Sequence, residues 1–114
     1  MTGEELASFL KVHILEKGPM DTLYFPHHHD TTLKIAHETI VGTGRRCAGQ
    51  GDLLAGALAA LLSLSQNESD IPQLVSFGSL LIRRANEIAF QQFGWSTITS
   101  DIQRCLPQAF QELF

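Results

Sequence analysis

The residues most able to do chemistry stand in one run: Arg45, Arg46, Cys47, Ala48, Gly49, Gln50, Gly51 and Asp52. The glycines on both sides of Gln50 allow a ligand to approach the backbone closely, because no Cβ stands in the way. A strongly helical, apolar run follows Asp52 at once, and the free N–H groups of a helix N-terminus bind anions. The run therefore predicts a phosphate site in which Gly49, Gln50 and Gly51 supply N–H groups. Asp52 is expected where a phosphate and an acceptor hydroxyl would meet.

Other polar residues carry weaker signals. Arg45 and Arg46 either contact phosphates or form a solvated surface pair, and the residues alone leave both readings open. The run His27-His28-His29-Asp30 contains imidazoles that suit zinc or nickel. Adjacent residues point in different directions, however, whereas structural metal sites use spaced ligands. We therefore predict no metal site there, and no nucleophilic role for Cys47.

Composition limits the class of protein. The chain has 114 residues, of which 44% are hydrophobic and 18% charged, as expected for one small globular domain. The net charge of −4 and the absence of a basic stripe exclude an obvious nucleic-acid partner. No apolar run is long enough to span a membrane, and no targeting segment is visible. We expect a cytoplasmic protein, with a mitochondrial location left open.

The first part of the chain is predicted to contain a short helix and short strands. Thr2, followed by Glu5 three residues later, is typical of a capping box at a helix start. Short extended runs then indicate three strands, at residues 12–15, 23–25 and 33–36.

The rest of the chain is predicted to be helical. The run Leu53–Leu64 is apolar on all sides and includes several small residues, a pattern typical of a buried helix. Asp70, Pro72 and Gly94 have the types and places expected at the two ends of a second helix. Ser100, with a glutamine three residues later, indicates the start of a third.

These residues resemble a known family. The segment Gly44–Gly56 is similar to the signature of ATP-dependent NAD(P)H-hydrate dehydratases, which belong to the ribokinase-like superfamily and share a Gly-x-Gly-Asp loop that opens a helix. Lys17–Asp21 resembles the family's upstream nucleotide segment, and Ser96–Asp101 resembles its C-terminal end. The three segments appear in the family's order and together cover nearly the whole chain. The family usually has glycine at the position of Ala48.

The resemblance implies a fold of the α/β class. The chain would be one domain over residues 1–114, the C-terminal portion of a ribokinase-like three-layer α/β/α domain, with short strands followed by three helices. Much of the parallel sheet and of the substrate pocket would be supplied by a preceding half that this chain lacks.

The resemblance also implies a reaction and a site. The substrate would be hydrated NADH or NADPH (NADHX or NADPHX), which ATP phosphorylates at the added hydroxyl before phosphate leaves and the dihydronicotinamide ring is restored. Mg²⁺ is expected because phosphoryl transfer from ATP recruits it. Asp52 would be catalytic and contact the substrate. The implied ATP-binding residues are Lys17, Gly18, Pro19, Met20, Asp21, Gly42, Thr43, Gly44, Arg45, Arg46, Cys47, Ala48, Gly49, Gln50 and Gly51.

Two alternatives remain at this stage. One is another ribokinase-like small-molecule kinase. The other is a non-catalytic fragment that binds nucleotide or a partner chain, because a sheet cut short leaves an unpaired edge and uncovered apolar helix faces. A homo-oligomer, or a partner chain that covers the missing half, would follow from the second alternative.

Overall fold

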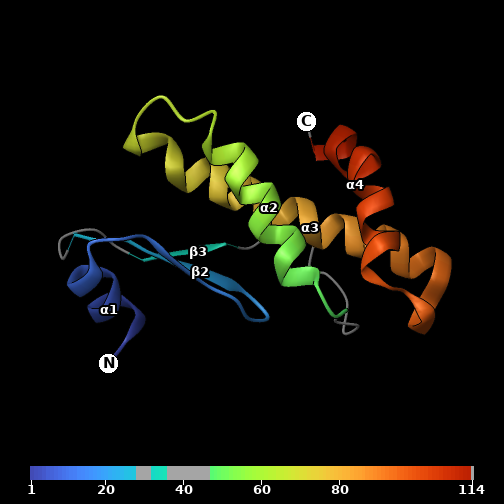
Figure 1. The fold of residues 1–114 in the computed structure, drawn as a ribbon, viewed down its shortest axis with the longest axis horizontal. Helices are drawn as coiled ribbons and strands as arrows, with labels where there is room; N and C mark the ends of the chain where they lie inside the picture. The colour runs from blue at the N-terminus through green and yellow to red at the C-terminus, as the bar shows by residue number, and fades with distance from the viewer. Residues whose placement is uncertain (28–31, 36–46, 114) are drawn as a thin grey trace. The chain divides into compact units, whose positions relative to one another are not determined.

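A computed structural model describes residues 1–27, 32–35 and 47–113 of the chain. It divides into two compact units, Met1–Ala36 and His37–Phe114, and each is described by itself. The first unit contains α1 (Gly3–Leu10), β1 (Ile14–Glu16), β2 (Asp21–Tyr24) and β3 (Leu33–Ile35) (Figure 1). The expected single domain over the whole chain stays a prediction.

Helix α1 begins as the sequence predicts. The Thr2 hydroxyl accepts a hydrogen bond from the Glu5 N–H, and the Glu5 carboxylate accepts one from the Thr2 N–H. This reciprocal capping box satisfies two of the N–H groups that a helix start leaves without partners. The helix ends at Lys11, whose left-handed backbone has a φ of 58°.

The three predicted strands are confirmed, with ends displaced by one or two residues. They form one sheet in the order β1-β2-β3, and both neighbouring pairs are antiparallel. Leu15 pairs with Leu23, and Leu23 pairs in turn with Leu33. Residues alternate across a strand, so Asp21 and Leu23 share one face of β2, and both are buried.

The second unit is entirely helical in its described part, and the three helices expected after the strands are confirmed. They are α2 (Gln50–Leu62), α3 (Ile71–Phe93) and α4 (Thr99–Leu113) (Figure 1). Short 3₁₀ turns precede the last two: η1 (Glu68–Asp70) before α3, and η2 (Gly94–Ser96) before α4.

The predicted ends of α3 are confirmed and the predicted start of α4 is wrong. Asp70 lies at the N-cap of α3, Pro72 lies in its first turn, and Gly94 ends it with a φ of 56°. Helix α4 begins at Thr99, ahead of Ser100. Its first turn is closed by Asp101, whose carboxylate accepts the Ile98 N–H at 3.0 Å. Because α4 begins at Thr99, the residue three positions after the one that precedes the helix is Asp101, and its carboxylate takes the place expected for Gln103.

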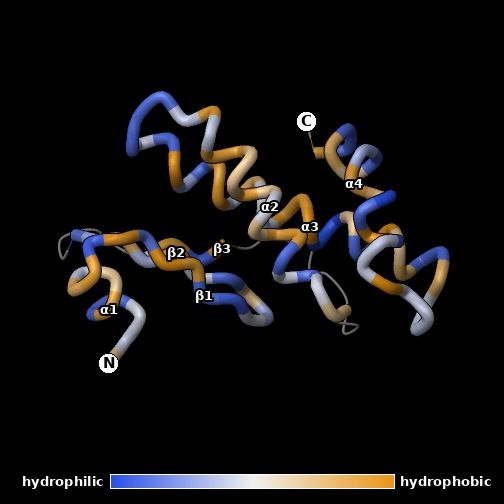
Figure 2. The backbone as a smooth tube through the Cα atoms, viewed as in Figure 1, coloured by the Kyte–Doolittle hydropathy of each residue, from blue (hydrophilic) through white to orange (hydrophobic). Residues whose placement is uncertain are grey.

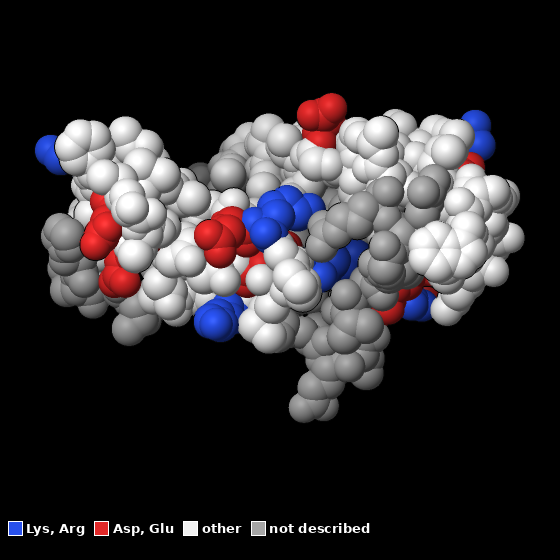
Figure 3. Space-filling view, turned by 90° about the horizontal axis from the view of Figure 1, so that it is seen from below, with Lys and Arg blue, Asp and Glu red and all other residues white. Residues whose placement is uncertain are grey.

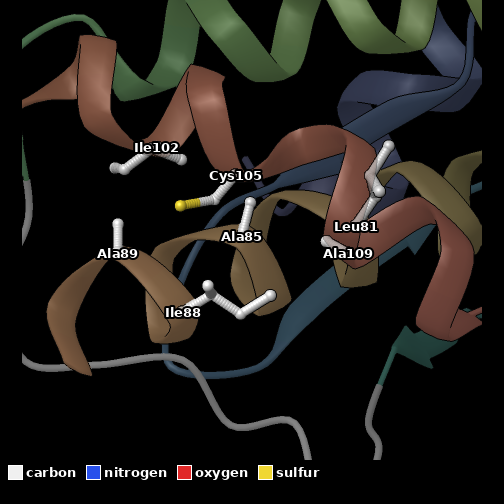
Figure 4. Packing of buried hydrophobic residues seen from close by; sticks show 7 residues of the cluster. All are labelled: Leu81, Ala85, Ile88, Ala89, Ile102, Cys105 and Ala109. Atoms are coloured by element: carbon white, nitrogen blue, oxygen red, sulfur yellow. The ribbon is translucent and has the colours of Figure 1, made fainter. Parts of the chain in front are cut away.

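The core of this unit lies between α3 and α4. Figure 4 shows side chains of α3 facing those of α4. Alanines at the contact let the two helix backbones approach closely, and Ile102 fills the space beside them with no exposed surface. The cluster consists of Leu81, Ala85, Ile88, Ala89, Ile102, Cys105 and Ala109.

The prediction that α2 is buried on all sides is wrong. Most of the helix is coloured white to orange in Figure 2, which marks residues of neutral to high hydropathy. Leu54 is nevertheless its only buried apolar residue. Leu58 packs against α3, where a Cβ added at Gly78 would lie 2.7 Å from Leu58 Cδ2. Because α3 covers one side of α2, the opposite side remains exposed; its small residues are Ala55, Gly56, Ala59 and Ala60.

The charged residues form local pairs. Arg84 of α3 donates to the Glu112 carboxylate of α4 at 2.5 Å. This hydrogen bond raises the pKa of Arg84 and lowers the pKa of Glu112. On the face drawn in Figure 3, neither the acidic nor the basic side chains gather into one large patch. Within the described ranges, no helix combines the length and the hydropathy needed to cross a membrane.

Candidate functional site

A tight turn, Cys47–Gln50, leads into α2. The Gln50 N–H donates to the Cys47 carbonyl at 3.1 Å, and the Gln50 Oε1 accepts the Cys47 N–H at 3.3 Å. Gly49 has a φ of 87° and a ψ of −2°, close to the values of about +80° and 0° at the third position of a type II turn. Only glycine adopts this conformation without strain, so Gly49 is required by the backbone.

Ala48, which stands where the family usually has glycine, fits this turn. Among the described non-glycine residues only Lys11 has a positive φ, so the Ala48 backbone lies in a region open to any residue. Its side chain is exposed and displaces no neighbour. The turn therefore needs one glycine at position 49 and tolerates alanine at position 48.

The N-terminus of α2 presents unused N–H groups. The Leu53 N–H makes the first helical bond, to the Gly49 carbonyl at 3.1 Å. In the described part of the chain, the N–H groups of Gly49, Gly51 and Asp52 have no acceptor, and all three residues are exposed. The sequence predicted Gln50 as a donor, but its N–H is used inside the turn. Gly49, Gly51 and Asp52 are therefore the N–H groups open to an anion.

Asp52 lies in the first turn of α2, with its side chain exposed. The N-cap position belongs to Gly49, so Asp52 is not a helix cap. Among the described residues, no hydrogen bond or ion pair engages its carboxylate. An acceptor held beside open N–H groups can orient a hydroxyl toward a bound phosphate.

The turn is attached to the α3–α4 core by packing contacts and by two hydrogen bonds. Cys47 and Leu53 pack against the core cluster. The Cys47 thiol donates to the Thr97 carbonyl at 3.3 Å, and the Thr99 hydroxyl donates to the Ala48 carbonyl. The sequence analysis placed both threonines in the segment Ser96–Asp101 but gave neither a role at this turn, because their partners lie 50 and 51 positions earlier in the chain.

The predicted nucleotide segment Lys17–Asp21 belongs to the other unit. Its residues 17–20 connect β1 to β2, and Asp21 is the first residue of β2. The Asp21 carboxylate accepts the Gly18 N–H at 3.1 Å, and only 1% of this residue is exposed. The Asp21 side chain thus closes the turn between β1 and β2. The remaining predicted residues lie outside the described ranges: Gly42, Thr43, Gly44, Arg45 and Arg46.

The histidine run falls mostly outside the described residues as well, since of its members only His27 is described. Among the described residues, no three or more His, Cys, Asp or Glu side chains form a group that could hold a metal ion.

Comparison with known proteins decides the family. The family model described as NAD(P)H-hydrate dehydratase matches residues 1–108. The chain belongs to this family. The resemblance to this family is thereby confirmed.

Curated relatives carry the name ATP-dependent (S)-NAD(P)H-hydrate dehydratase. One from Drosophila melanogaster is 41% identical over 106 residues, which cover 90% of this chain and 34% of the relative. One from Arabidopsis thaliana is 35% identical over 111 residues, covering 90% of this chain and 29% of the relative. One from Danio rerio is 44% identical over 81 residues, which cover 64% of this chain and 24% of the relative. The matched part of the chain thus spans about a quarter to a third of the length of these relatives.

The two cysteines of this dehydratase-family chain should react at different rates. Cys105 is 7% exposed, and burial, followed by the charge of Asp101, raises its pKa. Each unit of elevation lowers the reactive thiolate fraction about tenfold. At pH 8, iodoacetamide should therefore alkylate the half-buried Cys47 first, as mass spectrometry of peptides would measure. A Cys47→Ser variant should react only after denaturation, and rapid labelling of the folded variant would contradict the burial of Cys105.

Proposed function

We propose that this chain provides the nucleotide-binding and catalytic loop of an ATP-dependent NAD(P)H-hydrate dehydratase, a lyase that repairs NADHX and NADPHX. One observation carries the proposal: three open N–H groups at the start of α2 lie beside the exposed carboxylate of Asp52. The names of the relatives support the substrate class. We also propose that this chain is the C-terminal portion of a ribokinase-like three-layer α/β/α domain.

The chemistry follows from the positions of these groups. The N–H groups of Gly49, Gly51 and Asp52 stabilise the charge that develops on the transferring phosphoryl group. Asp52 orients the substrate hydroxyl and accepts its proton as the oxygen attacks the γ-phosphorus of ATP. The bond from the γ-phosphorus to the ADP oxygen breaks, and ADP leaves. The phosphate ester then loses phosphate and a proton from the adjacent carbon, which restores the ring double bond.

The remaining implied residues are part of the proposal. Lys17–Asp21 would border the nucleotide. Gly42–Arg46 would precede the run from Cys47 to Asp52, which we call the phosphate loop. Mg²⁺ would be bound mainly by the phosphates of ATP, as is usual for this ion. Its chemistry would be to neutralise phosphate charge. No protein ligand is assigned to it.

Gly51→Val tests the phosphate site, with Gly56→Val as its matched control. Both glycines lie in α2, and a Cβ added at either meets nothing within 4 Å, so the two variants should fold equally well. Valine at position 51 would occupy the space in which a phosphate approaches the backbone. We expect calorimetry with Mg²⁺ to show ATP binding by wild type and Gly56→Val, and none by Gly51→Val. Equal affinity in all three proteins would sink the proposed site.

Asp52→Asn tests the catalytic role. The amide keeps the size of the side chain but cannot accept the hydroxyl proton, so turnover of NADHX should fall by about 10²–10⁴-fold, while ATP binding remains. Turnover is followed by the recovery of NADH absorbance, and Glu16→Gln, an exposed acid of β1, is the control. Undiminished turnover by Asp52→Asn would remove this residue from the mechanism. A wild-type chain that binds ATP without turnover would show that catalysis needs a second chain.

A second candidate function rests on the exposed side of α2. Small apolar residues there have no neighbour to cover them in the described part of the chain, and Leu64 beyond the helix is 67% exposed. A contiguous apolar surface of this kind favours association with another chain. In this reading the protein is a non-catalytic fragment, bound to a second copy or to a partner.

Ala59→Glu tests this second function. A carboxylate in the middle of the exposed α2 side would have to be desolvated in any contact made there, which is unfavourable. If the chain self-associates through α2, the mass measured by sedimentation should rise with concentration for wild type and stay monomeric for Ala59→Glu. Gln91→Glu, which adds the same charge at an exposed position of α3, should behave as wild type. A monomeric wild-type chain would exclude self-association as its function.

A further inference from the structure

The start of α4 and the residues just before it are bonded to Cys47 and Ala48, two adjacent residues of the turn before α2. The Thr97 carbonyl accepts the Cys47 thiol at 3.3 Å, and the Thr99 hydroxyl donates to the Ala48 carbonyl. Thr99 also lies next to Gly49, since a Cβ built on Gly49 would be 3.7 Å from Thr99 Oγ1 and 3.8 Å from its Cγ2. The threonine side chain therefore covers one side of the Ala48–Gly49 peptide.

That peptide is the central one of the turn Cys47–Gln50. Type I and type II turns differ in the orientation of this peptide: the dihedral angles on its two sides each change by roughly 150–170° between the types. The carbonyl oxygen and the N–H of one planar trans peptide point in opposite directions. A contact that holds the Ala48 carbonyl on one side thus directs the Gly49 N–H to the other.

We propose that Thr99 is a positioning residue of the phosphate loop. Its hydroxyl holds the Ala48 carbonyl toward α4, and the peptide then presents the Gly49 N–H on the side away from Thr99, where it is exposed. Without the hydroxyl, the peptide can rotate toward the type I orientation, in which the Gly49 N–H no longer points to that side. The start of α4 thereby contributes to nucleotide binding without touching the nucleotide. This inference rests on the proposed function.

The first turn of α4 holds the Thr99 hydroxyl in place. Asp101 accepts the Ile98 N–H, which closes the first turn and fixes the backbone from which the Thr99 side chain extends. Asp101 is 9% exposed, and Ile102, the next residue, is fully buried in the α3–α4 core. Thr99 is therefore anchored to the most tightly packed part of the unit, whereas the peptide that it holds is exposed.

Thr99→Val removes the hydroxyl and keeps the shape of the side chain, and two measurements on the full chain test it. The first is hydrogen exchange by NMR of the Gln50 amide, which the turn protects through its bond to the Cys47 carbonyl. The second is the Kd of Mg²⁺-ATP by calorimetry. We expect faster Gln50 exchange and roughly tenfold weaker ATP binding in Thr99→Val, since one hydrogen bond is lost. Thr99→Ser, which keeps the hydroxyl, should restore both. Ser100→Ala, at the next and exposed position, should alter neither.

Each outcome decides a different claim. Unchanged Gln50 exchange in Thr99→Val would overturn the role of Thr99 in the turn. Faster exchange with wild-type ATP affinity would overturn its link to phosphate binding. A wild-type chain with a protected Gln50 amide that binds no ATP would refute the proposed function, while the exchange of Thr99→Val would still decide whether the hydroxyl holds the peptide.

Discussion

The close packing of α4 on α3 is the constraint on which the second unit depends. Three alanines, Ala85, Ala89 and Ala109, have no exposed surface and belong to the same buried cluster as Ile102 and Cys105. A core of this density leaves little freedom to shift one helix along the other. The connection from Gly94 to Ile98 is fixed at both ends by this packing. Residues that have no chemistry of their own thereby determine where Thr97 and Thr99 lie.

The proposed phosphate loop is held by several contacts that leave its N–H donors open. Gln50 folds its side chain back onto the Cys47 N–H, Cys47 and Leu53 reach into the core, and Thr99 holds the Ala48 carbonyl. Each contact uses a side chain or a carbonyl oxygen. The N–H groups of Gly49, Gly51 and Asp52 stay free in the described part of the chain, which is the arrangement that a preorganised anion site requires.

Local signals in the sequence predicted the parts of the fold that local bonds determine. The capping box of Thr2 and Glu5, and the ends of α3 at Asp70 and Gly94, depend on neighbours within a few residues, and they are confirmed. The glycine turn that opens α2 was found for the same reason, because Gly49 and the helix start are adjacent in the chain, whereas its anion binding stays a prediction.

What the sequence did not reveal depends on distant contacts. Thr97 and Thr99 bond residues 50 and 51 positions earlier, and no periodicity or spacing carries that information. The burial of α2 was predicted wrongly because an apolar pattern on all sides indicates what a helix can bury and not how many neighbours cover it. Here α3 covers one side, through Leu58 and Gly78.

The open N-terminus of α2 and its exposed side depend on different parts of the protein. Its N-terminus needs only the turn, the α3–α4 core and Thr99 to present N–H groups, and all of these lie within residues 47–113. Recognition of a dinucleotide substrate needs a pocket wall as well, because small-molecule sites bury most of their ligand. The exposed side of α2 is where a further structural layer could pack. In the proposed function, phosphate binding would need this unit alone, whereas selection of NADHX or NADPHX would need surfaces beyond it. The two parts of the proposal can therefore be tested separately.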